Sequence, residues 1–281
     1  MNFNTIFGEI EKVDPEVYDR LDTRRKAMKS FAGFSGKLAL AAIPMALGSM
    51  LQKAYAGTKS TNEAIVDILN YALKLEYLES EFYKMGLQSP VLIPSGVAVN
   101  AITTISSHET AHVKFLTDTI TAAFGASNVT PKPTSYDFTA KGTFLDISTN
   151  FDTFLAVAQT LEDTGVRAYK GRAAELIKGG AYLTAALNIH SVEARHASHI
   201  RQMRKLRTPA LNVKPWITGN KSAIAVTSVD KSYAGEDNTL QVNIQIVNIN
   251  SMGTSTDAAT EAFDEGLSKD AVLAIVAPFF V

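Results

Sequence analysis

The chain contains Ser106-Ser107-His108-Glu109-Thr110-Ala111-His112-Val113-Lys114-Phe115-Leu116, in which metal-binding residue types interrupt an apolar helical pattern. Glu109 and His112 are three residues apart, so on a helix both side chains project from one face. That face is otherwise apolar, because apolar residues recur at steps of three and four, at Ala98, Ile102, Ile105, Leu116 and Ile120. A carboxylate and an imidazole are costly to bury there unless they are paired, and a metal ion binds both ligand types at once.

Two kinds of metal site fit this motif. His108 and His112 are four residues apart with Glu109 between them, which matches the zinc-protease pattern of two histidine ligands and a glutamate base. Glu109 and His112 alone form Glu-x-x-His, one half of a carboxylate-bridged two-metal site. A single occurrence would equally fit a hydrogen-bonded core histidine beside a surface glutamate. Recurrence of the pattern separates these interpretations.

The Glu-x-x-His pattern occurs a second time, in a predicted helix from Tyr182 to about Leu206. There Glu193 and His196 stand on the apolar stripe of the helix. An internal duplication of polar residues on apolar faces is difficult to obtain by chance. The repeat therefore favours the two-metal interpretation over the zinc site and over an isolated core histidine.

The repeat extends to the helix that precedes each motif. In both halves a glutamate on the apolar face is followed by a tyrosine seven residues later, Glu76 by Tyr83 and Glu162 by Tyr169. Each half thus supplies three potential ligands, a lone glutamate and a Glu-x-x-His pair. The two tyrosines are candidates for outer hydrogen-bond donors to the ligand carboxylates, and packing as core aromatics explains them equally well.

The alignment of the two halves also predicts which glutamate of the first helix is buried. Gly165 occupies the position in the second half that matches Glu79 in the first. We therefore expect Glu76, rather than Glu79 or Glu81, to be the buried glutamate.

The complete set resembles the ligand set of the ferritin-like family of carboxylate-bridged four-helix bundles: Glu76, Glu109, His112, Glu162, Glu193 and His196. In such proteins two helices each contribute a glutamate and the other two contribute Glu-x-x-His. The motif resemblance covers about residues 62 to 205. The runs Leu75–Tyr83 and Ala262-Phe263-Asp264-Glu265 are similar, more narrowly, to bacterial ferritin-like-domain proteins that carry export signals.

The resemblance implies an all-α fold with two Fe or Mn ions per chain, bridged by Glu109 and Glu193 and capped by Glu76 and Glu162. It implies an oxidoreductase of the ferroxidase, peroxidase or catalase type, acting on Fe(II), peroxide or O2 under oxidative or metal stress. Family members linked to stress or desiccation imply a second possibility, a non-enzymatic protein with a structural metal site. A zinc metalloprotease that uses His108 and His112 is a remote alternative. A homo-oligomer is compatible with the resemblance.

The resemblance also implies that the two helical hairpins are related by a pseudo-twofold axis, so that the second and third helices run in the same direction. Their connection must then travel the length of the bundle. A helix of ~24 residues is about 36 Å long, and the segment from Gly125 to Asn150 reaches that at ~3.3 Å per residue. We expect the bundle to occupy residues 57–207, with the long crossover between its second and third helices.

The first 56 residues are expected to be an export signal. Arg24-Arg25 precedes an Ala- and Leu-rich run, and Ala54-Tyr55-Ala56 is an A-x-A cleavage signature. The region resembles a twin-arginine signal, which implies a periplasmic or cell-envelope protein with no stable membrane span after processing. A membrane-anchoring helix is the alternative.

Residues 208–281 are expected to form an extension packed on the bundle. Asn238 to Asn250 alternates as a strand or hairpin. Ser251 to Thr260 is expected to be a flexible polar loop, and a short helix is expected after Ser268 as its cap.

Composition limits the remaining function classes. The 281-residue chain is 46% hydrophobic and 20% charged, with a formal net charge of -1, so no nucleic-acid surface is expected. The absence of cysteine excludes disulfides, thiolate catalysis and cysteine metal sites. Of the five histidines, three lie beside the motifs and are expected at flanking or surface positions: His108, His190 and His199.

Overall fold

The structure is a computed structural model that describes residues 59–176, 179–241 and 243–281. The described residues belong to one compact unit, Met50–Val281. The predicted export signal at 1–56 lies outside the described residues. Among the helices of the described part, none is both long and apolar enough to cross a bilayer.

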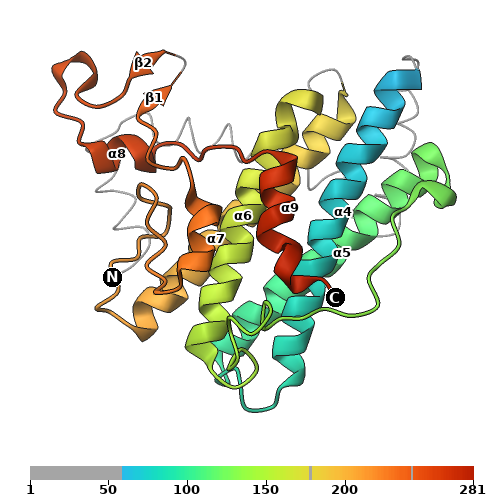
Figure 1. Ribbon diagram of the computed structural model, residues 1–281, viewed down its shortest axis with the longest axis horizontal. Coiled ribbons are helices and arrows are strands. Elements are labelled where there is room, and N and C mark those ends of the chain that lie inside the picture. The colour runs from blue at the N-terminus through green and yellow to red at the C-terminus, as the bar shows by residue number, and fades with distance from the viewer. Residues whose placement is uncertain (1–58, 177–178, 242) are drawn as a thin grey trace, which may run out of the picture. The chain divides into compact units, whose positions relative to one another are not determined.

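Four long helices form the body of this unit, as predicted: α4 (Lys59–Gln88), α5 (Val97–Phe124), α6 (Phe151–Ala173) and α7 (Ala181–Arg207) (Figure 1). The helix α4 packs along α5, and α6 packs along α7, so the bundle consists of two hairpins. The predicted long crossover joins α5 to α6 and contains only the short 3-10 helix η1 (Ala126–Asn128). The all-α bundle with this connection is therefore confirmed.

Local sequence signals set the helix ends. Gly125 has φ 95°, a conformation that glycine adopts without strain, and α5 ends there. The side chain of Asn150 accepts hydrogen bonds from the backbone amides of Asp152 and Thr153, which caps the first turn of α6. The helix α7 begins after Gly180, close to the predicted Tyr182.

The longer elements of the C-terminal extension are the helices η3 (Thr227–Tyr233), α8 (Thr256–Glu261) and α9 (Lys269–Val276), and a hairpin of β1 (Leu240–Gln241) and β2 (Ile244–Gln245). The predicted hairpin is present but short, with Leu240 paired to Gln245 in antiparallel register. The predicted cap is confirmed, since the Ser268 side chain accepts from the backbone amide of Ala271. The extension also includes the 3-10 helices η4 (Ile249–Ser251) and η5 (Ala277–Phe279).

The expectation of a flexible polar loop from Ser251 to Thr260 is wrong. The helix α8 begins at Thr256, and the side chain of Ser255 caps it by accepting from the backbone amide of Ala258. Ala259 is buried on its inner face. The polar composition of this segment hid a capped helix in which Ala259 and Thr260 face inward.

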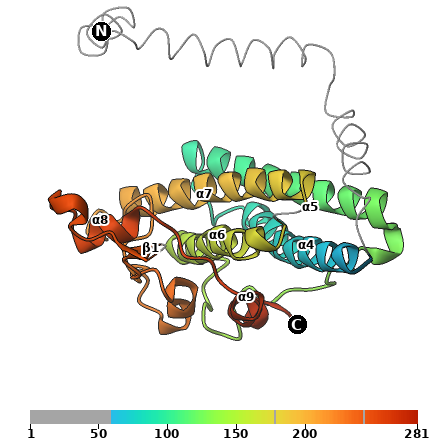
Figure 2. The ribbon, with the colours of Figure 1, turned by 90° about the horizontal axis from the view of Figure 1, so that it is seen from above.

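The extension packs against α6, and it also contacts α4 through the Lys269–Asp67 ion pair and α7 through Arg204, which donates to the carbonyl oxygen of Ala223. The helices α9 and η3 both contact α6. Figure 2 shows α5 and α7 in one layer, α4 and α6 in the next, and α9 beyond them on the far side. Consequently α6 is buried along most of its length.

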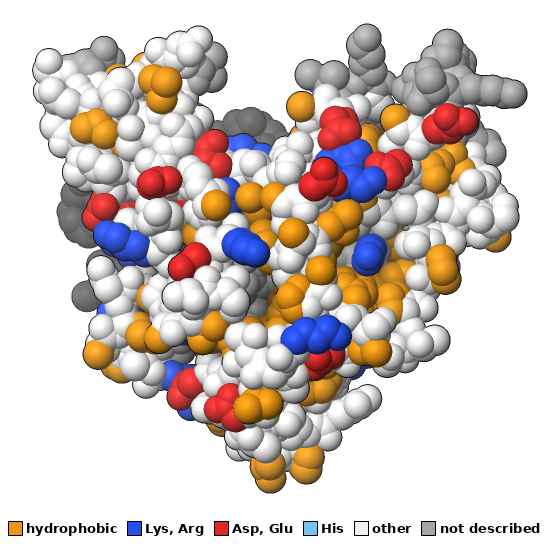
Figure 3. Space-filling view, viewed as in Figure 1, with side chains coloured by type: hydrophobic (Ala, Val, Ile, Leu, Met, Phe, Trp, Pro, Cys, Tyr) orange, Lys and Arg blue, Asp and Glu red, His pale blue; other side chains and the backbone are white. Residues whose placement is uncertain are grey.

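A buried arginine joins the extension to α6. The Arg167 side chain, 1% exposed, forms an ion pair of 2.7 Å with Glu236 and donates hydrogen bonds to the carbonyl oxygens of Ser232, Ala234 and Glu265. These partners satisfy the buried charge, which would otherwise be costly. On the molecular face seen in Figure 3, acidic and basic side chains are interspersed, and hydrophobic side chains collect between them.

Candidate metal centre

The structure brings the six predicted ligands together in the centre of the bundle. They form two groups in which the ligand atoms lie within 4.8 Å of one another. The first group is Glu76, Glu109, His112 and Glu193, and the second is Glu109, Glu162, Glu193 and His196. Glu109 and Glu193 belong to both groups, as is required of residues predicted to lie between two ions.

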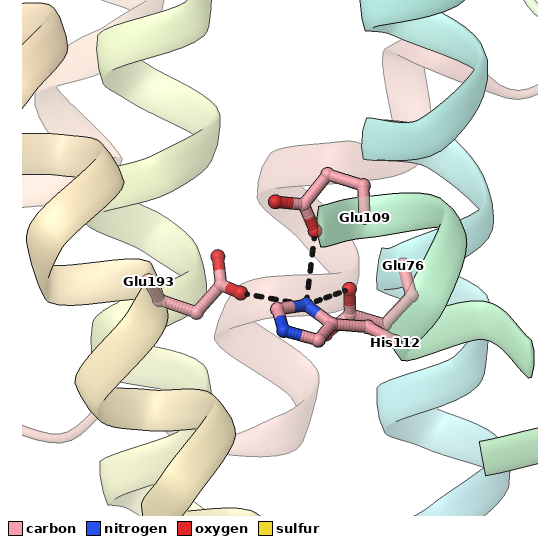
Figure 4. A group of neighbouring side chains, drawn as sticks. All are labelled: Glu76, Glu109, His112 and Glu193. Carbon is pink, nitrogen blue, oxygen red and sulfur yellow. Dashed lines mark hydrogen bonds and ion pairs between the residues drawn. The ribbon is translucent and has the colours of Figure 1, made fainter. Parts of the chain in front are cut away.

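The first group converges on one nitrogen of His112. Its Nδ1 atom lies 3.1 Å from Oε2 of Glu76, 3.2 Å from Oε2 of Glu109 and 3.2 Å from Oε1 of Glu193 (Figure 4). These side chains come from α4, α5 and α7, and all three carboxylates are fully buried. The periodicity of each helix places its polar side chain on the apolar face, and the packing of the hairpins brings the faces together.

The second group is arranged around His196 in the same way. Its Nδ1 atom lies 2.8 Å from Oε1 of Glu109 and 3.4 Å from Oε2 of Glu162. His112 and His196 therefore both direct Nδ1 toward the carboxylates. Glu109 approaches one histidine with each of its two oxygens.

The two tyrosines are hydrogen-bonded to site carboxylates across the hairpins. The Tyr83 hydroxyl on α4 donates to Oε1 of Glu162 on α6 at 2.5 Å, and the Tyr169 hydroxyl on α6 donates to Oε1 of Glu76 on α4. Both rings are buried. Each tyrosine therefore both packs in the core and orients the carboxylate of the opposite hairpin, and the two roles do not exclude each other.

The expectation that Glu76 would be the buried glutamate in preference to Glu79 is incomplete, because both are buried. Glu79 is 3% exposed. A Cβ atom added at Gly165 would lie 3.3 Å from Oε1 of Glu79 and 3.2 Å from Oε2 of Glu193. The glycine that matches Glu79 in the repeat thus leaves the space into which the Glu79 carboxylate projects. The available signal was the three-residue spacing from Glu76, which places Glu79 on the same helix face.

Burial and mutual proximity shift the protonation of the cluster. Burial raises the pKa of Glu109 to about 7, although His112 and His196 beside it act to lower that pKa. Burial is the main reason why the pKa of Glu193 lies well above its usual range, and the negative charge of Glu109 is the second. Burial lowers the pKa of His196, but the nearby Glu162 and Glu109 outweigh it and raise that pKa to about 11. In the metal-free chain, bound protons therefore balance the negative charge that metal cations would otherwise balance.

The donor set fits a metal ion better than it fits internal hydrogen bonding. Several buried ligand atoms have close neighbours but no hydrogen bond within the described structure: Oε1 of Glu109, Oε2 of Glu162, both carboxylate oxygens of Glu193 and Nδ1 of His196. Buried polar atoms are normally paired. Oxygen and imidazole nitrogen donors in this number suit Fe or Mn.

His108 lies outside both ligand groups. Its Nδ1 atom is 2.9 Å from Nε2 of His196, on the side of that ring opposite the carboxylates, and the two rings stack at 5.2 Å. Among the described residues, no candidate metal group contains His108 together with His112. The zinc-protease alternative therefore has no geometric support, and His108 is placed to hold the His196 ring.

A groove between α5 and α7 reaches the centre from the surface, and sequence analysis did not identify it. Its volume is about 540 Å³. The lining residues include Asn100, Thr104, His108, Val192, Arg195, His196 and His199. His199 is exposed there, whereas His190 is half-buried. The groove depends on the distance between two helices, for which a linear sequence carries no signal.

Comparisons with known proteins agree with this architecture. The family model described as ferritin-like domain matches residues 64–206, which contain all six predicted ligands. Searches of curated proteins and of solved structures gave no match.

Proposed function

The chain belongs to the ferritin-like domain family, and on that basis we propose that its bundle holds two Fe or Mn ions with which the protein acts on O2, peroxide or Fe(II). The observation that carries this proposal is the sharing of Glu109 and Glu193 between two ligand groups. Two separate mononuclear sites would not need common carboxylates. The shared carboxylates keep the two cations close together, as a reaction that transfers two electrons requires.

The residues divide naturally between the two ions. Glu76 and His112 would hold one, Glu162 and His196 would hold the other, and Glu109 and Glu193 would lie between them. When bound, Fe or Mn would supply redox chemistry toward small oxidants. These four carboxylates and two neutral imidazoles would balance the charge of two divalent ions.

The protein matrix around the ligands would keep their geometry fixed. Tyr83 and Tyr169 each hold the carboxylate of a terminal ligand, and His108 holds the outer nitrogen of His196. Such outer contacts set the orientation and basicity of metal ligands. The apolar walls of the bundle keep bulk water away from the carboxylates, which strengthens their attraction for cations.

Access for small molecules supports a reactive centre over a closed structural one. The groove between α5 and α7 is lined by both His108 and His196. None of the residues that line the groove belongs to the extension, so within the described part of the chain the extension leaves this approach uncovered. The complete burial of the carboxylates favours the second candidate, a structural metal site in a stress- or desiccation-related protein.

The deciding experiment is rapid mixing of the reduced, metal-loaded protein with O2 and, separately, with peroxide, after metal analysis has established two Fe or Mn per chain. We expect oxidant consumption, which is lost in Glu162→Ala. The matched control is Asp118→Ala, which removes a surface carboxylate of α5 paired with Lys114. No consumption of either oxidant at full occupancy would leave the structural candidate. One tightly held Zn would refute the dinuclear site.

We also propose that the protein is exported by a twin-arginine type signal, from Arg24-Arg25 and Ala54-Tyr55-Ala56. The mature chain is expected to begin at or near Gly57. Replacing both arginines by lysine should retain the protein in the cytoplasm. Mass spectrometry of cell-envelope material that still begins at Met1 would refute cleavage.

A further inference from the structure

The exposed surface of α5 and α7 carries positive side chains and few negative ones. Over residues 97–117 of α5 the only acidic residue is Glu109, and in α7 the only one is Glu193. Both are fully buried in the metal centre. Basic side chains of the same two helices are exposed, among them Lys114 and Arg195. This surface therefore attracts negatively charged molecules, although the chain as a whole has a formal net charge of only -1.

Arg195 is the permanently charged residue among those that line the groove between α5 and α7. Within the described part of the chain no carboxylate forms an ion pair with it, and its side chain makes one long hydrogen bond of 3.4 Å, to the Ser191 hydroxyl one turn earlier. The other arginines of α7 all have side-chain partners on α6: Arg201 with Asp163, Arg204 with Gln159, and Arg207 with Asp152. The Arg195 guanidinium is therefore available to a ligand in the groove.

The groove combines this charge with an apolar wall. Ala101, Ile105 and Val192 line it, and of these Ile105 is buried and the other two are half-buried. Asn100 adds a side-chain amide that can donate a hydrogen bond. The volume of about 540 Å³ lies within the range of about 300–1,000 Å³ that is usual for small-molecule sites. One charge, a few polar groups and an apolar wall are typical of a site for an organic molecule rather than for an inorganic ion.

We propose that this groove is a binding site for a small organic carboxylate. The carboxylate group pairs with Arg195, because a planar guanidinium presents two parallel donors to it. The apolar body of the ligand lies against Ile105 and Val192. The bound molecule lies beside His108 and His196, on the approach to the metal centre. The inference goes beyond the proposed function and stands without it, because none of these contacts requires a metal ion.

The test is a titration of the metal-free full chain with benzoate, hexanoate and phenylacetate, followed by calorimetry and by ligand-observed NMR. The metal-free chain is used because a carboxylate can also bind a metal ion directly. We expect saturable binding of at least one of these acids at one site per chain. Its uncharged amide, benzamide in the case of benzoate, should bind about tenfold more weakly or worse. Arg195→Gln should weaken binding of the acid by about the same factor and leave binding of the amide unchanged.

Two matched pairs of variants locate the site. Lys114→Gln removes the same charge as Arg195→Gln, from an exposed residue of α5 that pairs with Asp118 and does not line the groove, so it should not change binding. Thr104→Trp fills the groove and should abolish binding, whereas Thr103→Trp, on the exposed surface of the same helix, should not. Thermal unfolding shows whether each variant remains folded, which is expected because all these side chains are exposed.

Four results would overturn the inference. The first is that none of the three acids binds with a Kd below about 10 mM. The second is binding that Arg195→Gln and Thr104→Trp leave unchanged, because the ligand would then lie elsewhere. The third is equal affinity for acid and amide. The fourth is inorganic phosphate binding as tightly as the organic acids, because the apolar wall would then contribute nothing.

These results are distinct from those that test the proposed function. A chain that binds two metal ions and no carboxylate would leave the metal centre standing and refute the ligand site. A chain that binds a carboxylate through Arg195 and takes up no metal would refute the proposed function and leave the ligand site standing.

Discussion

The Tyr83 hydroxyl on α4 donates a 2.5 Å hydrogen bond to Glu162, which lies 79 residues later on α6. Tyr169 on α6 donates to Glu76 on α4 in return. The two helices thus exchange hydroxyl and carboxylate groups through the middle of the bundle. This exchange fixes their relative register, because a shift of either helix along its axis would break both contacts.

Replacing Tyr83 by Phe should leave one buried carboxylate oxygen of Glu162 without its donor. We expect the metal-free protein to lose about 1.5–3 kcal/mol of unfolding free energy and metal affinity to fall about tenfold. Denaturant unfolding and metal titration measure the two effects. Tyr77→Phe is the control, since Tyr77 is buried on the same helix but packs in an apolar cluster. Equal effects of both substitutions would show that ring packing, not the hydroxyl, is responsible.

Removing a shared carboxylate should affect both ions, whereas removing a terminal one should affect a single ion. Glu109→Ala or Glu193→Ala is therefore expected to abolish binding of both ions, and Glu76→Ala to leave about one ion per chain. His108→Ala should leave the stoichiometry unchanged. Elemental analysis of the purified variants gives the ratios. If His108→Ala alone emptied the centre, the ligand assignment would be incorrect and the zinc interpretation would return.

Helix periodicity predicted the four helices and the polar residues on their apolar faces, because each depends on a local pattern. The long crossover followed from the family resemblance and from the length of the segment between Gly125 and Asn150. Glu79 was missed for an identifiable reason. The repeat register treated Gly165 as evidence that the matching position does not face the centre, whereas the glycine supplies the space for the longer side chain. An internal repeat predicts the features that its two halves share. It does not predict a pair of matching positions, such as Glu79 and Gly165, at which the small residue of one half leaves space for the large side chain of the other.

The contacts made by the extension could not be predicted from the sequence, for a different reason. Arg167 is buried on α6 and is paired with Glu236, 69 positions away in sequence. Neither residue belongs to a motif, and their approach depends on how the segment after α7 folds back. The capped helix α8 was missed because its polar composition resembles a loop, although Ser255 carried the capping signal.

Metal loading should release protons. In the metal-free chain His196 has a pKa of about 11 and is therefore protonated at neutral pH, and Glu109, with a pKa of about 7, is partly protonated. Both must lose their protons to bind a cation, so affinity should rise with pH by about tenfold per unit for each proton released. Calorimetry in two buffers of different ionisation enthalpy counts the protons. An affinity that stays constant between about pH 6 and 8 would contradict this expectation.

Gly171 should tolerate no side chain, because the extension crosses α6 in direct backbone contact there. A Cβ atom at Gly171 would lie 1.9 Å from the carbonyl oxygen of Leu267. Gly171→Ala is expected to cost about 3 kcal/mol or more and to expose the segment after Leu267 to proteases. In Gly253→Ala nothing lies within 4 Å of the new atom and only the positive φ of 71° is strained, so about 1 kcal/mol is expected. Similar losses in both variants would show that the crossing yields easily.

The last prediction concerns the groove between α5 and α7. If oxidants reach the centre by this route, filling the groove should slow their consumption without displacing the ions. Thr104 lines the groove, so Thr104→Trp is expected to lower the rate of peroxide consumption by roughly tenfold at unchanged metal content. Thr103→Trp is the matched control, since Thr103 is exposed on the same helix and does not line the groove.

Stopped-flow rates for the two variants, measured at equal occupancy, separate blocked access from a damaged centre. Slow reaction in Thr104→Trp alone supports the groove as the entrance to His108 and His196. Equal rates in both variants and the wild type would place the entrance elsewhere. The apolar cavity lined by Ala72, Leu116 and Tyr169 would then be the next route to block, because Tyr169 is hydrogen-bonded to the ligand carboxylate of Glu76.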